Sequence, residues 1–197
     1  MQSLTANEAK VMDFLVRNFH EKNSINEIAR RLNLSPMGSY KILKKFEKID
    51  AVKVDKIGQA LYYKANLDSE IGIKLAELVL VQNELNSYAK VQAEDFEVLK
   101  EITLSCILFG SVITKGKEAN DIDVFLVLDR KNYKEVSKRL REIKERKPKK
   151  IQDVMATKED LIKNIKQKDE VILDILKTGK VLWGSEIIVE AIKHGSS

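Results

Sequence analysis

The chain lacks the features that mark disulfide-rich, secreted or membrane-spanning proteins. Its 197 residues include one cysteine, Cys106, which lies inside an apolar run. A disulfide framework is therefore excluded, and a buried, unreactive thiol is expected. No stretch resembles a signal peptide or a transmembrane helix, because charges interrupt the amphipathic residues 5–21. We therefore expect a cytoplasmic protein with no membrane partner. Internal repeats and low-complexity segments are also missing.

What the sequence does contain is enough apolar material for folded cores and an uneven charge. Hydrophobic residues make up 44% of the chain, and the length suffices for two small domains. Residues 1–67 hold 12 Lys/Arg and 7 Asp/Glu, residues 68–102 hold 3 and 8, and residues 103–197 hold 20 and 15. Two basic blocks thus flank an acidic connector. Polyanions are plausible partners for both blocks, although surplus lysine also serves as a solubilising surface.

Residues 105–129 organise the rest of the chain. They contain two apolar runs of strand length, and the second run is preceded by Asp121-Ile122-Asp123. Successive side chains of a strand point to opposite faces, so Asp121 and Asp123 should share one face. Two adjacent carboxylates repel each other unless a cation lies between them, and Mg²⁺ prefers such oxygens. The pair predicts a metal site; the alternative is a charged edge strand that resists aggregation.

Gly110-Ser111 ends the first apolar run. A glycine at a strand end permits a sharp turn, and the following serine is expected to cap a short helix that Gly116 ends. The start of such a helix presents free N–H groups to an anion. We therefore expect a phosphate-binding turn that faces the two carboxylates.

Gly-Ser, nine intervening residues and then Asp-x-Asp on a strand resembles the signature of the DNA polymerase beta-like nucleotidyltransferases, and among them the minimal nucleotidyltransferase (MNT) type. The resemblance covers about residues 96–192. It implies Mg²⁺-dependent transfer from a nucleoside triphosphate, with ATP the expected one. Asp121 and Asp123 would hold the metals, and Gly110 and Ser111 would hold the β,γ-phosphates. This chain departs from the pattern in having Asn120 where many members have Ser, and no Arg after Ser111.

The same resemblance implies a third carboxylate on the next strand. Residues 151–156 are the predicted strand, and Asp153 is the candidate, on a face with Ile151 and Met155. The alternative is a bystander near a strand end. The minimal type also implies an acceptor: a partner HEPN toxin that an antitoxin adenylylates, a small molecule or a nucleic-acid end. The competing interpretation is a transcriptional regulator whose nucleotidyltransferase-like domain only senses nucleotide.

The N-terminal residues predict three helices and a hairpin. Capping boxes at residues 5–8 and 24–27 begin the first two helices, and Ser35-Pro36 begins a third that runs to Lys48. Two strands, 51–54 and 60–64, surround Gly58. This order resembles a winged helix-turn-helix domain over about residues 4–66, which implies binding to double-stranded DNA, whereas a protein-contact module is the alternative. The implied DNA contacts are Ser39, Tyr40, Lys41 and Lys45 on the third helix and Lys56 and Gln59 on the wing; Tyr40 is alternatively a core residue.

The sequence therefore predicts an α+β protein of three parts. These are a winged helix-turn-helix domain at residues 1–67, a helical connector at 68–95, and an α/β nucleotidyltransferase domain with a small mixed sheet at 96–197. Residues 68–90 carry more apolar side chains than one amphipathic stripe needs. A homodimer contact, packing between the domains, or ordinary core packing would cover them. Residues 157–177 are expected to form one helix.

Overall fold

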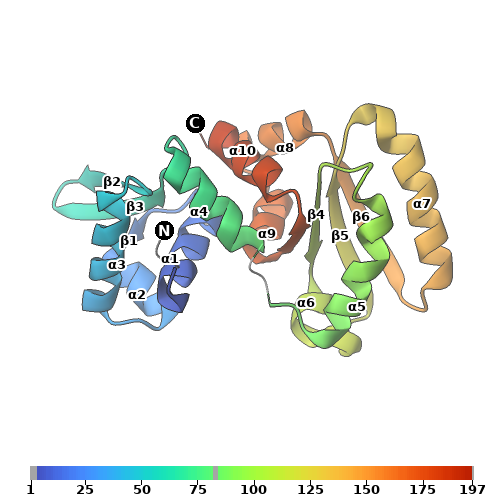
Figure 1. Cartoon of the computed structure of the whole chain (residues 1–197), viewed down its shortest axis with the longest axis horizontal. Coiled ribbons are helices and arrows are strands. Elements are labelled where there is room, and N and C mark those ends of the chain that lie inside the picture. Colours follow the sequence, from blue (N-terminus) through green and yellow to red (C-terminus); the bar gives the residue numbers. More distant parts are fainter. Residues whose placement is uncertain (1–3, 82–83, 197) are drawn as a thin grey trace. The chain divides into compact units, whose positions relative to one another are not determined.

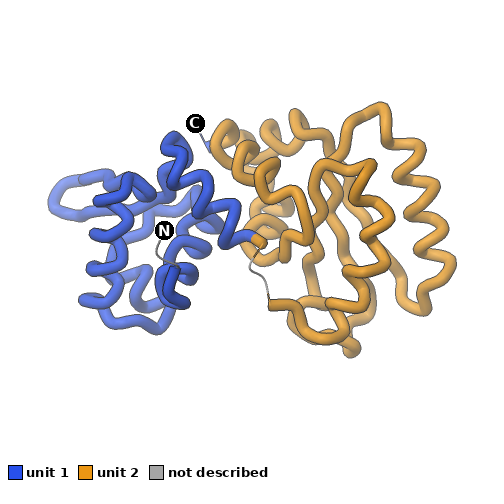
Figure 2. Tube along the Cα trace, in the orientation of Figure 1, with its two compact units in different colours: residues 1–80, 196 blue, residues 81–195, 197 orange. Residues whose placement is uncertain are grey.

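The computed structural model describes residues 4–81 and 84–196 and divides the chain into two compact units. Unit 1 comprises the residues up to Leu80 together with Ser196, and unit 2 runs from Val81 to Gly195 (Figure 2). In the described ranges, no helix has both the length and the apolar character needed to cross a membrane. The expected α+β class is confirmed, because both units combine helices with a small sheet (Figure 1).

In its described residues, unit 1 contains four helices and a three-stranded antiparallel sheet. The helices are α1 (Ala6–Arg17), α2 (Ile25–Leu32), α3 (Pro36–Lys48) and α4 (Glu70–Val81). The sheet has the order β1 (Asn23–Ser24), β3 (Ala60–Ala65), β2 (Val52–Ile57), and β2 and β3 form a hairpin. The core of unit 1 includes Leu15, Ile28, Leu43, Phe46 and Tyr63, all of which are buried.

The starts of the first three helices follow from local capping. The Thr5 hydroxyl accepts a hydrogen bond from the backbone N–H of Glu8, and the Glu8 carboxylate accepts one from the backbone N–H of Thr5. Ser24 and Ser35 cap α2 and α3 through their hydroxyl groups, and Pro36 occupies the first turn of α3. These three helix starts are confirmed, because each depends only on residues within one turn.

Unit 2 is built on a four-stranded sheet of order β6 (Lys150–Ala156), β5 (Asp121–Val127), β4 (Ser105–Phe109), β7 (Lys180–Trp183). β5 and β6 are parallel and the other pairs are antiparallel, so the sheet is mixed, as expected. The helices are α5 (Ser87–Phe96), α6 (Ser111–Lys115), α7 (Tyr133–Arg146), α8 (Lys158–Lys166), α9 (Glu170–Thr178) and α10 (Ser185–Gly195).

The single helix expected at residues 157–177 is two helices, α8 and α9. Lys168 between them has a left-handed backbone conformation with φ 56°. Asp169 then caps α9 by accepting a hydrogen bond from the N–H of Ile172. A residue in the left-handed region ends an α-helix, and the new cap begins another.

The two faces of the unit 2 sheet have different cover. Ile122, Val124 and Leu126 of β5 join a buried cluster with Phe96 near the end of α5 and Leu140 of α7 (Figure 1). The residues that alternate with these three along β5 point to the second face, where α9 and α10 contact β4. Asp121 and Asp123 belong to this second face.

Candidate functional site

Two carboxylates stand at the start of β5. Asp121 and Asp123 are both partly exposed, whereas the intervening Ile122 is buried on the opposite face. Burial, and secondly the charge of Asp121, raise the pKa of the Asp123 carboxyl above its ordinary value. Two neighbouring carboxylates repel each other when both are ionised. A cation placed between their oxygens offsets this repulsion. Hard oxygen ligands on one face fit Mg²⁺.

Gly110 lies directly against this pair. β4 ends at Phe109, which is paired in the sheet with Asp123. Gly110 follows with φ 72° and ψ −155°, a region open almost only to glycine. A Cβ at this position would overlap Asp123 Oδ2 and lie 3.0 Å from Asp123 Cγ. The turn into α6 and the carboxylate of Asp123 therefore occupy adjoining space, and only a glycine fits between them.

The cap of α6 differs from the expected one. Gly110 is the N-cap residue, and Ser111 is the first residue of the helix, so the serine hydroxyl does not cap it. The first N–H groups of a helix have no partner inside the helix. The backbone of α6 thus begins beside Asp123 with donors of its own, as the phosphate-binding interpretation requires.

Asn86, which the sequence did not single out, holds this turn in place. Asn86 Nδ2 donates to the carbonyl oxygens of Val112 (3.0 Å) and Ile113 (2.9 Å), and Asn86 Oδ1 accepts from the N–H of Ala89 at 2.8 Å. This side chain therefore ties α6 to the start of α5. Its partners in α6 lie more than 20 residues away, so no local pattern could have identified the contact with α6, although its cap on α5 is local.

Lys149 fixes the loop that leads into the carboxylates. Its Nζ donates to the carbonyl oxygens of Lys117 and Ala119 and lies 5.2 Å from the centroid of the Tyr88 ring. A basic run such as residues 144–150 is usually a solvated turn or a phosphate contact. Lys149 instead satisfies two carbonyl groups immediately before Asp121, which fixes where β5 begins.

Asp153 is not brought to the pair. In the parallel register of β5 and β6, Val124 is opposite Asp153 and Asp123 is opposite Gln152. Asp153 therefore lies on the α7 face, where it forms an ion pair with Lys144. The expectation of a third metal carboxylate at Asp153 is corrected accordingly. In the part of the chain that the structure describes, no three His, Cys, Asp or Glu side chains come together as a metal-binding group.

Gln152 occupies the position beside the carboxylates. Its Nε2 donates a hydrogen bond to Asp121 Oδ2. The sequence did contain a signal for this arrangement: Asp153 alternates in phase with the apolar Ile151 and Met155, and so points to the packed face. The third position next to the pair is therefore a neutral amide.

The expected DNA contacts divide between exposed and buried residues. Tyr40 is 42% exposed, so it is not a core residue. Ser39 is fully buried, and its hydroxyl has no hydrogen-bond partner. The expected Ser39 contact is therefore corrected, because Ser39 lies one turn before Leu43 on the inward stripe of α3.

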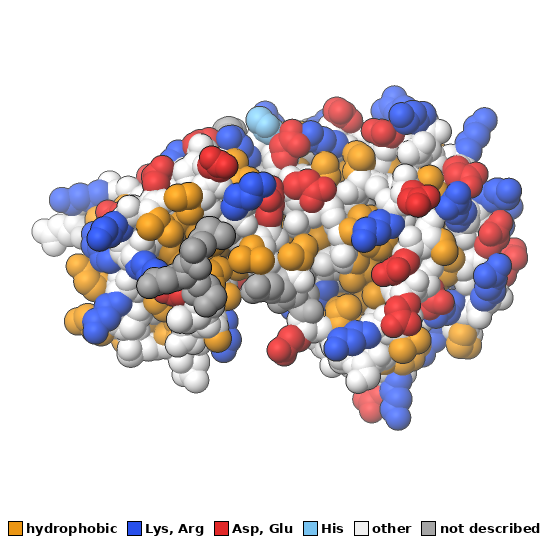
Figure 3. Space-filling model, in the orientation of Figure 1, with side chains coloured by type: hydrophobic (Ala, Val, Ile, Leu, Met, Phe, Trp, Pro, Cys, Tyr) orange, Lys and Arg blue, Asp and Glu red, His pale blue; other side chains and the backbone are white. Residues whose placement is uncertain are grey.

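Lysine and glutamine side chains make up the remaining expected contacts. Lys41, Lys56 and Gln59 are exposed. Lys45 Nζ forms an ion pair with Glu8 Oε1 at 2.6 Å, so its charge is already paired within unit 1. The visible face of the molecule mixes basic and acidic side chains over both units (Figure 3). Charge on this face alone therefore does not mark a polyanion surface.

Comparison with known proteins addresses the C-terminal part of the chain. Neither the curated proteins nor the solved structures gave a match to this chain. A family model described as "Polymerase beta, Nucleotidyltransferase" matches residues 93–186, a little under half of the chain, which include Gly110, Asp121 and Asp123. This match supports the nucleotidyltransferase superfamily for residues 93–186 and indicates nucleotidyl transfer in general as the chemistry of this domain.

Proposed function

We propose that unit 2 transfers a nucleotidyl group from a nucleoside triphosphate, with ATP the expected one, to an acceptor hydroxyl in a reaction that requires Mg²⁺. One observation carries the proposal. The carboxylate of Asp123 is packed against Gly110 at the start of α6, within the segment that matches the nucleotidyltransferase family. Donors for phosphate and ligands for a divalent cation thus adjoin each other, as nucleotidyl transfer requires.

The residues of the site have separate roles in this proposal. Asp121 and Asp123 would hold Mg²⁺, which would neutralise the triphosphate and stabilise the charge that develops during transfer. Gly110 lets the phosphates approach the backbone, and the N–H and hydroxyl groups of Ser111 donate to them. Asn86 and Lys149 keep the two segments in place.

Gln152 limits what this site can hold. Mg²⁺ is commonly bound by one or two carboxylates together with substrate phosphates, so the Asp pair suffices for one Mg²⁺–nucleotide complex. A second ion would gain no further negative charge from the amide of Gln152. We therefore expect nucleotide binding to be easier to detect at this site than rapid nucleotidyl transfer.

The test is incubation with labelled ATP, GTP, CTP and UTP in the presence of Mg²⁺, together with calorimetry of nucleotide binding. Asp121→Asn and Asp123→Asn should abolish label transfer, because each removes a charge from the pair. Asp153→Asn is the matched control: its carboxylate lies on the opposite face, so transfer should persist. A wild-type chain that binds no nucleotide overturns the proposal.

The second candidate function is regulation, and Gln152 is the observation that favours it. A domain that holds Mg²⁺–nucleotide without a third carboxylate serves as a nucleotide sensor if it does not complete the transfer. A wild-type chain that binds nucleotide but transfers no label establishes the sensor. Gln152→Glu supplies the missing charge, so a gain of transfer in this variant would show that the amide is what limits the chemistry.

For unit 1 we propose a winged helix-turn-helix that binds double-stranded DNA. The order of its helices and hairpin supports the proposal, as do exposed Tyr40, Lys41, Lys56 and Gln59. The side-chain amino groups of Lys41 and Lys56 have no hydrogen bond or ion pair to another described residue. Both are therefore available for phosphate contacts.

Salt dependence tests the DNA proposal on the whole chain. The log–log slope of affinity against salt should fall by about 0.9 for each phosphate contact that Lys41→Ala or Lys56→Ala removes. Lys10→Ala is the matched control, because it removes an exposed lysine of α1 and should leave the slope unchanged. Binding that is absent or insensitive to salt would make unit 1 a protein-contact module.

The acceptor and the assembly follow from the same proposal. An antitoxin of this kind would adenylylate a partner HEPN toxin in the cytoplasm and repress its own promoter; the other acceptors are a small molecule or a nucleic-acid end.

A homodimer through α4 is proposed from Ile71, Leu78 and Val81, which are 48%, 40% and 47% exposed. Sedimentation of the intact chain tests the dimer, and a monomer at all concentrations contradicts it.

A further inference from the structure

A groove lies between α7 and the edge strand β6, on the sheet face opposite Asp121 and Asp123. Its cavity has a volume of about 250 Å³, and a second cavity of about 160 Å³ continues it past Tyr133 and Met155, which line both. Pockets for small ligands usually measure ~300–1,000 Å³. The α7–β6 groove, as we call these two cavities, therefore suits a small ligand.

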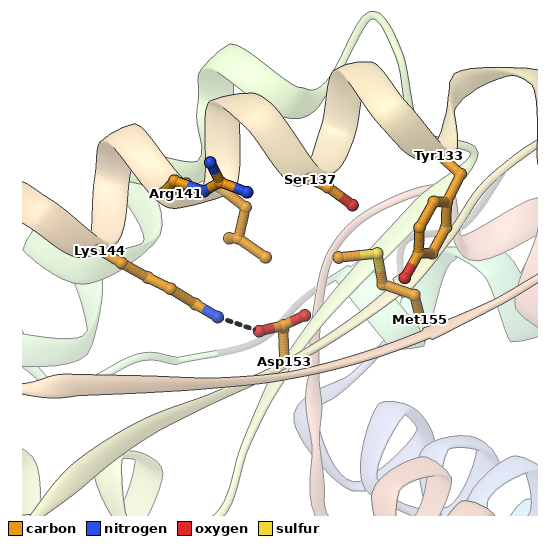
Figure 4. A pocket seen from close by; sticks show the side chains of 7 residues that line it. Tyr133, Ser137, Arg141, Lys144, Asp153 and Met155 are labelled. Atoms are coloured by element: carbon orange, nitrogen blue, oxygen red, sulfur yellow. Dashed lines mark hydrogen bonds and ion pairs between the residues drawn. The ribbon is translucent and has the colours of Figure 1, made fainter.

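The wall of the groove is regular. Tyr133, Ser137, Arg141 and Lys144 follow one another at helical spacing along α7, so they form one stripe. The opposite wall carries Met155 two residues after Asp153 on β6. Figure 4 shows the Ser137 hydroxyl and the Tyr133 ring directed into the space beside Met155. An aromatic ring, a thioether and a hydroxyl thus meet within one cavity.

In the larger of the two cavities, the charged side chains leave one cation without an ion pair among the described residues. Lys144 and Asp153 form an ion pair, so they largely cancel each other (Figure 4). Arg141 lines the same cavity, and its guanidinium group has no hydrogen bond or ion pair among residues 4–81 and 84–196. The hydroxyl group of Ser137 has no hydrogen-bond partner in these ranges either. A free guanidinium offers two parallel donors, which match the geometry of phosphate and carboxylate.

We propose that the α7–β6 groove binds a small planar ring that carries an oxyanion, either phosphate or carboxylate. Arg141 and Ser137 donate to the oxyanion, and the ring packs between Tyr133 and Met155. The site is separate from the carboxylate pair, which lies across the sheet. It therefore does not depend on the proposed nucleotidyl transfer.

The test is an NMR titration of the full-length chain labelled with ¹³C at the methionine methyl groups. Phenyl phosphate, benzoate and inorganic phosphate are added separately, up to about 10 mM, where a millimolar site is nearly saturated. The methyl signal of Met155 should shift saturably with phenyl phosphate or benzoate, and the tighter of the two identifies the oxyanion. The methyl groups of Met12 and Met37 in unit 1 serve as internal references.

Variants at exposed positions then assign the contacts. Arg141→Gln should weaken the ring-bearing ligand by about tenfold or more, the value of a hydrogen bond to a charged group. Arg146→Gln is the matched control, an exposed arginine of the same helix outside the groove, and should change nothing. Tyr133→Ala should weaken phenyl phosphate by about two- to tenfold and leave inorganic phosphate unaffected.

Three results would overturn the proposal. One is a Met155 signal that does not move with either ring-bearing ligand. Another is an equal loss of affinity in Arg141→Gln and Arg146→Gln, which indicates unspecific attraction of anions. The third is loss of the shift in an Asp121→Asn/Asp123→Asn chain, which would place the ligand on the other face.

Discussion

Replacement of Gly110 by alanine tests whether the turn before α6 and the Asp123 carboxylate share the space that the structure assigns to them. The backbone conformation alone costs alanine ~1–3 kcal/mol. The added Cβ would also overlap Asp123 Oδ2, and overpacking of this kind usually costs a further ~1–3 kcal/mol. Gly116→Ala is the control: its φ of 57° is similar, but its Cβ would meet nothing closer than Asn86 Oδ1 at 3.3 Å.

The measurement is urea unfolding followed by the fluorescence of Trp183, the sole tryptophan, which is buried in β7 and donates from Nε1 to Thr103 at 3.1 Å. With a urea slope of about 2 kcal/mol/M, the midpoint of Gly110→Ala should lie about 0.5–1.5 M below that of Gly116→Ala. Asp123→Ala should recover part of this loss in the double variant, with a coupling of ~0.5–3 kcal/mol. Equal midpoints for the two glycine variants, or no coupling, would refute the proposed contact.

Three further predictions concern charge. Because the pKa of Asp123 is raised, its ionisation opposes folding at neutral pH and this penalty disappears as the pH falls; Asp121→Asn should lower the pKa of Asp123 in an NMR titration only partly, since burial is the larger cause. Lys149→Met should speed amide exchange before β5 and weaken Mg²⁺–nucleotide binding, with binding at wild-type strength as the contrary result. Burial would raise the pKa of Glu8, but hydrogen bonds from Lys45 and from the backbone and hydroxyl of Thr5 outweigh it and lower this pKa. Lys45→Met should therefore destabilise the chain by ~1–3 kcal/mol above pH 5, with the difference shrinking in acid; a difference independent of pH would count against that ion pair.

The sequence by itself determined the features whose causes lie within a few residues. Thr5, Ser24 and Ser35 begin helices because a cap needs only the next turn of backbone. Asp121 and Asp123 share a face because the pleat of a strand has a period of two. The break at Lys168 was also local, but a lysine in the left-handed region carries no strong signal in the sequence.

Only the tertiary structure decided which residues stand beside the carboxylates. The register of β6 against β5 is fixed by packing beneath α7, and a shift by one residue exchanges the two faces of a strand. Gln152 therefore meets Asp121, while Asp153 meets Lys144. Ser39 is one of the implied DNA contacts on the third helix, but the core of unit 1 covers it. Asn86 contacts α6, and Lys149 contacts the loop before β5, through partners more than 20 residues distant, which the chain brings together only when it folds.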